Sequence, residues 1–411
     1  MRIKLSWNKE WTGILLLFLS LRLIYSAMGL YVALGPEPYR LAREPIFDTT
    51  LPLLRHDPLS EKLVNIWFRW DTGWYLKIAA QGYSAQDSSI AYLPLYPLSI
   101  RWLASWLGEN YLLSALLVSN LALLVALLLL YELVRGEGAS QETATKSILS
   151  LLLFPTGFFL FAAYTESLFL ACVLGAWLAA RKGNWLLAGL LGALATLTRL
   201  QGVVLTPVLL WMVLSAGADQ YGENPAAQVK AVWKMLASSE SRRRFLQSRK
   251  RLTWLGACLP MLAFMAYSVW VQYAHLGGIQ QALESHWSIQ TVMPWTGFWK
   301  FLVRLFTQPH FFIDWIELCL FLPVMSLLIL GIFKLKPAYS LYNWLTLSIL
   351  FMRGTPPHLL DSFSRYYLSM FPLFILVGRI KNRKMQIVLW SLSFSLQLFL
   401  LRGFLDWRWV A

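Results

Sequence analysis

An aromatic stretch that contains one acidic residue is the first candidate for chemistry. It begins at Trp67 and reads W-F-R-W-D-T-G-W-Y-L-K-I-A-A-Q-G-Y, with Asp71 as its carboxylate. Helical spacing would put Trp67, Asp71 and Tyr75 on one face, so the pattern predicts an aromatic interfacial helix that presents an acid. A positioned carboxylate is able to act as a general base toward a hydroxyl group. The alternative is a structural salt bridge with Arg69 or Lys77, because an unpaired acid at membrane depth is costly.

A second aromatic motif follows, A-Y-L-P-L-Y-P at residues 91–97, and it ends with Tyr96 and Pro97. Pro94 and Pro97 both lack the N–H that a helix interior needs, so the pattern argues against a regular helix at this place. The structural interpretation is a kinked start of a helix, and the functional one is contact with a ligand.

The composition indicates which kind of scaffold holds these residues. Of the 411 residues, 57% are hydrophobic and 14% are charged, and the mean hydropathy is +0.53. Soluble domains carry about 25% charged residues, so the composition excludes a soluble globular enzyme and a disordered chain. The three cysteines lie inside apolar runs without paired spacing, which predicts neither a disulfide framework nor a zinc site.

Eleven apolar runs predict an all-α polytopic membrane protein, interpreted as a single integral membrane domain over residues 1–411. A spanning helix needs about 20 apolar residues, and several of the runs are shorter, so we expect these to tilt little or to line a water-filled cavity. A further run at 89–107 is broken by prolines and is predicted to be half-buried or re-entrant. The eleven runs are residues 11–33, 111–134, 147–163, 166–181, 185–198, 203–215, 252–274, 312–333, 338–352, 366–379 and 385–402.

Lysine and arginine residues predict the orientation of these runs. The basic segments 217–251 and 379–384 should be cytoplasmic, and Arg181, Lys182, Lys334, Lys336 and the N-terminus are predicted on the same side. The net charge of +15 then reflects loops that contact anionic lipid, and nucleic-acid binding is not predicted. The predicted external segments are 34–110 with its interfacial helices, a second loop at 275–311, the segment 353–365, and the turns 164–166 and 199–202.

This topology brings five charged or titratable side chains to the external side. Arg199 and Arg365 could hold an anion, since a guanidinium binds two oxygens at once. For Arg199, capping of the preceding helix or pairing with Glu166 is the alternative. Glu166 itself could be stabilised by a helix dipole or could support an arginine, and His358 could lie on a loop surface. The five are Asp71, Glu166, Arg199, His358 and Arg365.

The order of these motifs resembles a known family. The pattern W-D-x-x-W-Y-L-x-I-A-x-x-G-Y at 70–83, followed by P-L-Y-P, resembles the PIG-V family, the relatives of GPI mannosyltransferase 2 within the GT-C class of membrane glycosyltransferases. Further matches follow in family order and extend the resemblance over most of the chain. They are Phe154-Pro155, the run Y-T-E-S-L-F at 164–169, T-R-L-Q-G at 198–202 and S-R-Y-Y-L-S-M-F-P at 364–372.

The resemblance implies an enzyme that transfers mannose from a polyprenyl-phosphate donor to a lipid-linked or glycan acceptor on the non-cytoplasmic face, with inversion and with Asp71 as the general base. We expect Arg199, Arg365 and His358 to bind the donor phosphate. Many relatives carry paired acids in the first external loop, but Thr72 and Gly73 follow Asp71 here, so no metal and no other cofactor is predicted and metal dependence stays open. The residues expected to contact or support the acceptor are Glu166, Trp70, Trp74, Tyr75 and Tyr96.

Two other functions are compatible with the sequence. One is a GT-C transferase with another sugar or a protein acceptor, and the other is a lipid or solute transporter. A transporter should show repeated halves with matched broken helices, and the sequence shows no such repeat. The short loops favour a prokaryotic plasma membrane over the membrane of the endoplasmic reticulum, and we expect the partners to be the donor, the acceptor and membrane lipids.

Overall fold

The computed structural model of the chain describes residues 9–35, 50, 53–216, 224–241, 243, 251–354 and 358–410. Within these ranges the protein is helical, and the only β-structure is an isolated bridge between Thr291 and Arg353. The predicted all-α fold is therefore confirmed. Large parts of the predicted external loop 34–110 and of the basic loop 217–251 are described, but residues 36–49, 217–223 and 244–250 lie outside the described ranges.

Apolar helices correspond to all eleven predicted runs. Five of them, α1, α6, α13, α16 and α20, are long and apolar enough to cross a membrane, so the chain is an integral membrane protein; eleven crossings stay a prediction. The helices are α1 (Lys9–Ala33), α6 (Tyr111–Gly136), α7 (Gln141–Leu152), α8 (Glu166–Arg181), α9 (Trp185–Thr198), α10 (Leu205–Ser215), α13 (Arg251–Tyr273), α16 (Phe312–Lys334), α17 (Pro337–Phe351), α19 (Phe371–Gly378) and α20 (Arg383–Leu405).

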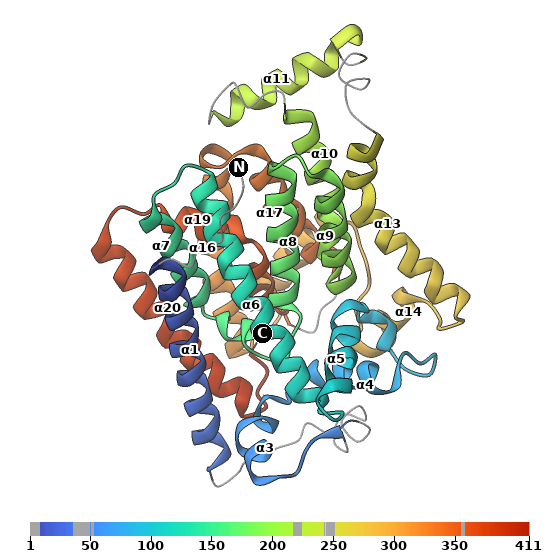
Figure 1. The fold of residues 1–411 in the computed structure, drawn as a ribbon, viewed down its shortest axis with the longest axis vertical. Helices are drawn as coiled ribbons and strands as arrows, with labels where there is room; N and C mark the ends of the chain where they lie inside the picture. The colour runs from blue at the N-terminus through green and yellow to red at the C-terminus, as the bar shows by residue number, and fades with distance from the viewer. Residues whose placement is uncertain are drawn as a thin grey trace.

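Shorter helices and 3₁₀ turns occupy the connections between them. The helices are α3 (Pro58–Leu63), α4 (Thr72–Gln81), α5 (Leu95–Trp106), α11 (Pro225–Ala237), α14 (Ile279–Trp287), α15 (Pro294–Thr307) and α18 (Phe363–Tyr366). The turns are η2 (Asn65–Trp67), η3 (Ser89–Ala91), η4 (Gly157–Leu160), η5 (Leu200–Val204) and η7 (Tyr367–Ser369). In Figure 1, α11 lies at the upper end of the molecule, whereas α3, α4 and α5 lie toward the lower end.

The centre of the bundle is built around α8, whose side chains are mostly buried. α8 packs against α6 on one side and α9 on the other, and α9 packs along α13. Where α9 meets α13, a side chain on Gly189 would come within 2.0 Å of the carbonyl oxygen of Gly256. Small residues at such a crossing let two backbones approach closely, which stabilises helix pairs in membranes.

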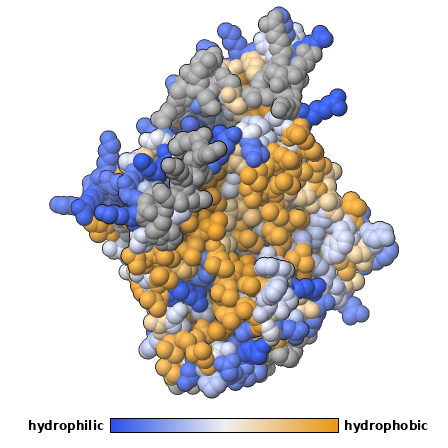
Figure 2. Space-filling view, in the orientation of Figure 1, coloured by the Kyte–Doolittle hydropathy of each residue, from blue (hydrophilic) through white to orange (hydrophobic). Residues whose placement is uncertain are grey.

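The two ends of the bundle are polar and the middle is apolar. Figure 2 shows a broad hydrophobic band across the middle of this face, with hydrophilic residues gathered mostly toward the upper and lower ends. α8 connects the two ends, because it begins at Glu166 and stops at Arg181. At the end where α8 stops, Arg181 and Lys336 both pair with Glu137, so two of the cations that we predicted to be cytoplasmic lie together.

The predicted aromatic helix around Asp71 begins later than expected. η2 ends at Trp67, and α4 starts after Asp71. Trp70, between them, has a φ of 48°, which is rare for a bulky residue and turns the chain sharply. The predicted common face of Trp67, Asp71 and Tyr75 is therefore wrong. The cause is tertiary: Arg69 turns into the core and donates two hydrogen bonds to the carbonyl of Leu405 at the end of α20.

Prolines explain three further differences from the predicted runs. The run 147–163 is not one helix, because α7 stops before Pro155 and only the turn η4 follows. The run 366–379 is divided between η7 and α19, with Pro372 in the first turn of α19. A helix starts within the motif 91–97, as the structural interpretation predicts, but α5 is regular from Leu95 on, because Pro97 lies in its first turn, where a missing N–H costs little. One side of α5 is buried and the other exposed.

Candidate active site

Asp71 lies at the N-terminus of α4 with both carboxylate oxygens engaged. Tyr92 donates its hydroxyl to Oδ1 at 3.0 Å, and Arg365 donates Nη1 to Oδ2 at 2.7 Å. The side chain of Asp71 is 25% exposed, whereas that of Arg365 is 8% exposed. The carboxylate is thus held from two sides and is still accessible, as a group that must meet a substrate needs to be.

The predicted ion-pair partners of Asp71 bind elsewhere. Arg69 is buried and donates to backbone carbonyls of Phe68 and Leu405, and Lys77 pairs with Asp87. The expectation that Asp71 pairs with Arg69 or Lys77 is wrong. Asp71 is nevertheless in a salt bridge, but its partner lies 294 positions away along the chain, which no local pattern could indicate.

Glu166, the first residue of α8, holds both candidate arginines. Its Oε1 accepts a hydrogen bond from Nη1 of Arg199 at 2.5 Å and another from Nε of Arg365. Nη1 of Arg199 also donates to the hydroxyl of Thr165 at 3.1 Å. Of the alternatives for Arg199, pairing with Glu166 is therefore observed. Because a carboxylate at a helix N-terminus is further stabilised by the helix dipole, Glu166 is well suited to hold two guanidinium groups in place.

We refer to Asp71, Glu166, Arg199 and Arg365 as the charged cluster. It contains two acids and two guanidinium groups, so its formal charges balance. Apart from Asp71, each side chain is less than 10% exposed. Burial lowers the pKa of Arg365, but Glu166 and Asp71 outweigh this effect and raise it well above its ordinary value, so this guanidinium stays charged.

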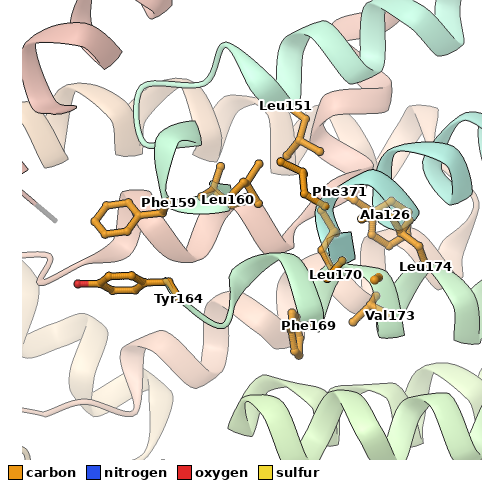
Figure 3. Close-up of a cluster of buried hydrophobic side chains, with 14 of the residues drawn as sticks. Ala126, Leu151, Phe159, Leu160, Tyr164, Phe169, Leu170, Val173, Leu174 and Phe371 are labelled. Carbon is orange, nitrogen blue, oxygen red and sulfur yellow. The ribbon is translucent and has the colours of Figure 1, made fainter. Parts of the chain in front are cut away.

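Aromatic rings surround the guanidinium groups. Arg365 lies 4.5 Å from the ring centre of Tyr164 and 5.3 Å from that of Phe159, and Arg199 lies 4.6 Å from that of Tyr366. Figure 3 shows Phe159 and Tyr164 at one end of the buried hydrophobic cluster. A cation over an aromatic face is attracted by the ring, more strongly where water is excluded. The rings therefore stabilise the charges without competing for their N–H groups.

Tyr92 is a member of the site that the sequence did not single out. The sequence predicts a contact for Tyr96 of the same motif, but Tyr96 is buried and bonds to the carbonyl of Ala115 and the hydroxyl of Ser119. Burial raises the pKa of Tyr92, and the neighbouring charge of Asp71 raises it further, so its phenol stays protonated and able to donate. The structure thus gives Tyr96 a packing role and Tyr92 the contact with the acid.

Trp70, Trp74 and Tyr75, which we predicted to lie near Asp71, have different neighbours in the structure. Trp74 stacks on the ring of Tyr92 with centres 5.6 Å apart, and Tyr75 meets Tyr92 edge-on at 5.2 Å. Both are buried and support Tyr92. The ring of Trp70 contacts Trp409 at 5.4 Å. Trp70 is only partly buried.

His358 is not part of the charged cluster. Its Nδ1 lies 3.7 Å from Oδ1 of Asp314, and its ring stacks on Trp409 at 5.9 Å. Among the described residues, its recorded contacts are with Asp314, Trp409 and Phe311, so it is joined to Asp71 only through the tryptophans. Four of the five side chains that were predicted to be external are therefore brought together, and the fifth, His358, contacts Asp314, Phe311 and Trp409 instead.

Comparison with known proteins agrees with the motifs. A family model described as Mannosyltransferase (PIG-V) matches residues 12–313, well over half of the chain. The chain belongs to the PIG-V mannosyltransferase family. The predicted resemblance to this family is thus confirmed. Asp71, Glu166 and Arg199 lie inside the matched range, and Arg365 lies beyond it.

Two solved structures are similar to this PIG-V family member. ArnT from Cupriavidus metallidurans, bound to undecaprenyl phosphate, is 14% identical, with a TM-score of 0.48; the match covers 93% of this chain and 63% of that one. The oligosaccharyltransferase of Archaeoglobus fulgidus, tethered to an acceptor peptide, is 11% identical with a TM-score of 0.44 and coverages of 95% and 55%. This chain therefore spans less than two thirds of either one. No curated protein matches the sequence.

An apolar cavity of about 640 Å³ lies behind Tyr92 in this PIG-V protein. Two of its lining residues, Tyr83 and Tyr267, donate hydrogen bonds to the carbonyl of Tyr92 at 2.8 and 3.5 Å. A third, Leu197, precedes Arg199 by two positions. Since the hydroxyl of Tyr92 binds Asp71, the lining of the cavity is connected to the charged cluster through Tyr92. Its lining includes Tyr83, Leu98, Leu197, Ala263, Tyr267 and Trp270.

Proposed function

We propose that the protein transfers mannose from a polyprenyl-phosphate donor to a hydroxyl of a lipid-linked or glycan acceptor, with Asp71 as the general base and with Arg199 and Arg365 on the donor phosphate. The observation that supports it is the charged cluster, in which an accessible carboxylate lies within hydrogen-bond distance of a buried guanidinium. General-base catalysis needs an accessible carboxylate of this kind, and a departing phosphate needs fixed positive charge nearby.

The proposed reaction is a single displacement. The acceptor oxygen forms a bond to the anomeric carbon while its proton passes to Asp71, and the bond between that carbon and the phosphate oxygen breaks. The leaving group is the polyprenyl phosphate, whose added negative charge is balanced by the two guanidinium groups. Because attack occurs opposite the leaving group, the configuration at the anomeric carbon is inverted.

Arg365 connects donor binding to the basicity of Asp71 in this proposal. It donates Nη1 to Asp71 and Nε to Glu166, and among the described residues Nη2 makes no recorded hydrogen bond. A phosphate that draws the guanidinium toward itself would weaken its hold on Asp71. A carboxylate that loses a cationic partner becomes more basic. The base would therefore be most effective once the donor is bound.

The apolar cavity suits the first units of a polyprenyl chain. Ala266 and Trp270 of α13 line it, and other apolar side chains of the same helix, such as Met265 and Val269, are exposed. Since Tyr83 and Tyr267 of the lining donate to the carbonyl of Tyr92, whose hydroxyl binds Asp71, a chain in the cavity would bring its phosphate toward the charged cluster. We therefore propose that the donor enters from the bilayer between α5 and α13.

We propose that this site faces the non-cytoplasmic side of a prokaryotic plasma membrane. The cations at the opposite end of α8 support this orientation through the excess of lysine and arginine in cytoplasmic loops. We also propose that the reaction needs no metal. Among the described residues, no group of three histidine, cysteine or acidic side chains is close enough to hold an ion, and both oxygens of Asp71 already accept hydrogen bonds.

The test is transfer by the purified protein in lipid nanodiscs, with labelled undecaprenyl-phosphate mannose as donor and a bacterial lipid and glycan extract as acceptor. Asp71→Asn keeps the shape of the side chain and removes its basicity, so we expect turnover to fall by about 10² to 10⁴. Asp406→Asn changes an acid that pairs with Arg402 near the surface and serves as the matched control. Normal turnover of a well-folded Asp71→Asn variant would refute the assignment of the base.

Donor competition identifies the sugar in the same assay. Unlabelled polyprenyl-phosphate mannose should suppress the labelled product, and the glucose analogue should not. Suppression by glucose alone would indicate a transferase with another sugar. In sealed proteoliposomes, labelled lipid that crosses the bilayer without any product would indicate a transporter instead.

A further inference from the structure

Two acids on α16 hold the segment that carries Arg365. Oδ1 of Asp314 accepts the N–H of Leu359 at 2.8 Å. Glu317, one turn further, accepts the N–H of Ser364 at 2.9 Å and its hydroxyl at 2.6 Å. The segment 358–365 is thus fastened near both ends to one helix, and the second fastening point is the residue next to Arg365.

Burial of Asp314 and Glu317 in an apolar helix costs free energy. Asp314 is 3% and Glu317 2% exposed, and both lie in a helix apolar enough to cross a membrane. An acid in such a segment costs about 2.5 to 3.5 kcal/mol at mid-bilayer, and although the N-terminal end of a helix reduces this cost, acids in such places mark functional positions. Among the described residues, Glu317 forms no ion pair; its recorded partners are the two donors of Ser364.

Other contacts complete the frame around Arg365. Arg353 donates to the carbonyl and to the carboxylate of Asp361 at 2.9 and 2.8 Å. Thr156 donates its hydroxyl to the carbonyl of Ser364 at 2.8 Å. Ser364 is therefore held at its N–H, its hydroxyl and its carbonyl. A residue fixed at all three groups fixes the backbone from which the side chain of Arg365 departs.

We propose that Glu317 is a positioning residue that fixes the direction of Arg365, with Asp314 as the second anchor of the same segment. Glu317 touches no reacting atom in this proposal. It holds Ser364 so that Nε of Arg365 meets Glu166 while Nη1 meets Asp71. The kinetic part of this inference rests on the proposed function, because it assumes that Arg365 stabilises the leaving phosphate.

A double-mutant cycle tests whether Glu317 acts through Arg365. We expect Glu317→Ala to lower kcat/KM by about 10², since a displacement of about 1 Å has effects of this size. In the Arg365→Lys background, the same change should lower it by no more than about twofold, because residues that act through one another are not additive. An equal factor in both backgrounds would overturn the proposal and give Glu317 a general role in the fold.

Two further variants separate positioning from catalysis and from stability. Glu317→Gln offers an oxygen to the N–H of Ser364 and an NH₂ to its hydroxyl, so we expect it to keep most of the activity; if Gln is as inactive as Ala, the charge and not the hydrogen bonding is required, which contradicts the proposal. Glu137→Ala removes a buried acid at the opposite end of α8. Its effect, whatever the size, should be equal in the wild-type and Arg365→Lys backgrounds.

A structural measurement is independent of the proposed function. In a cryo-EM map of the Glu317→Ala variant in nanodiscs, we expect Nη1 of Arg365 to lie beyond hydrogen-bond reach of Oδ2 of Asp71, which is 2.7 Å away in the wild-type protein. An unmoved Arg365 would overturn the positioning role even if the variant is inactive. If the wild-type protein transfers no sugar and the map shows the displacement, the proposed function fails while the positioning role stands.

Discussion

Two buried acids at opposite ends of α8 each hold two cations, and they differ in what else they touch. Glu166 binds Arg199 and Arg365, and Glu137 binds Arg181 and Lys336. Each acid is less than 10% exposed. By residue type alone, the two ends look alike.

The neighbours of the cations distinguish the two ends. Around Glu137, Arg181 is 26% and Lys336 36% exposed, and the hydroxyl of Tyr339 donates to the acid at 2.9 Å. Around Glu166, both guanidinium groups are buried among aromatic rings, and a second acid, Asp71, completes the cluster. Only the Glu166 end combines desolvated cations with an accessible carboxylate. We therefore expect chemistry at that end and a purely structural role at the other.

Among the changes that compare the two ends of α8, the largest effect is expected for Arg365, which joins Asp71 and Glu166. Arg365→Ala removes a cation from the place where negative charge develops on the phosphate, and such groups contribute about 10² to 10³ in rate. Arg181→Ala, the matched change at the Glu137 end, should leave kcat within about twofold, because Arg181 pairs with Glu137 at the end of α8 opposite the charged cluster. Rates are measured in nanodiscs with undecaprenyl-phosphate mannose. Equal losses in the two variants would end the functional distinction between the two ends.

The two acids themselves give the next test. Glu166→Gln keeps the size of the side chain but weakens its hold on both guanidinium groups, so we expect kcat/KM to fall by about 10², as for other misplaced catalytic groups. Glu137→Gln should lower the melting temperature without changing kcat, since breaking a buried pair destabilises the fold. Thermal unfolding and turnover are measured on the same preparations. A Glu166→Gln variant that loses stability but keeps its turnover would make the Glu166 end structural as well.

The helices could be predicted from the sequence because their apolar runs are continuous. Each of the eleven runs contains a helix, and the exceptions arise at prolines and at Trp70. There the chain departs from the periodic pattern because Arg69 finds partners at the end of α20. A contact between residues 336 positions apart overrides a local spacing that reads as a helix, and no local pattern shows that contact.

The candidate site could be predicted as a group but not as a set of contacts. Topology put Asp71, Glu166, Arg199 and Arg365 on one side, and they lie in one cluster. Their pairing depends on side-chain direction, which the sequence does not show. Because the sequence does not show side-chain direction, it also does not distinguish Tyr92 from Tyr96. Both stand in the same motif four positions apart, and only Tyr92 contacts Asp71.

The two acids of α16 form a sequence pattern that indicates a functional position. Asp314 and Glu317 are separated by one helical turn at the start of an apolar run, and an acid in such a run marks a functional position. That signal would have pointed to the two residues, but not to what they bind. Their partners are the backbone N–H groups of Leu359 and Ser364, and any sequence supplies such groups at every position except proline.

The smallest effect is expected for the tyrosines that donate to an acid at each end. Tyr92→Phe removes a hydrogen bond to Asp71, and because such bonds to a charged group are worth about 1.5 to 3 kcal/mol, we expect roughly a tenfold loss in kcat/KM. Tyr339→Phe removes the corresponding bond to Glu137 and should leave kcat unchanged. Since burial and Asp71 raise the pKa of Tyr92 well above its ordinary value, the phenol stays protonated, and the ratio of wild-type to Tyr92→Phe activity should be constant from about pH 7 to about pH 10. A ratio that falls toward 1 as the pH rises would show that Tyr92 ionises in this range and that its hydroxyl is not held against the carboxylate as the structure has it.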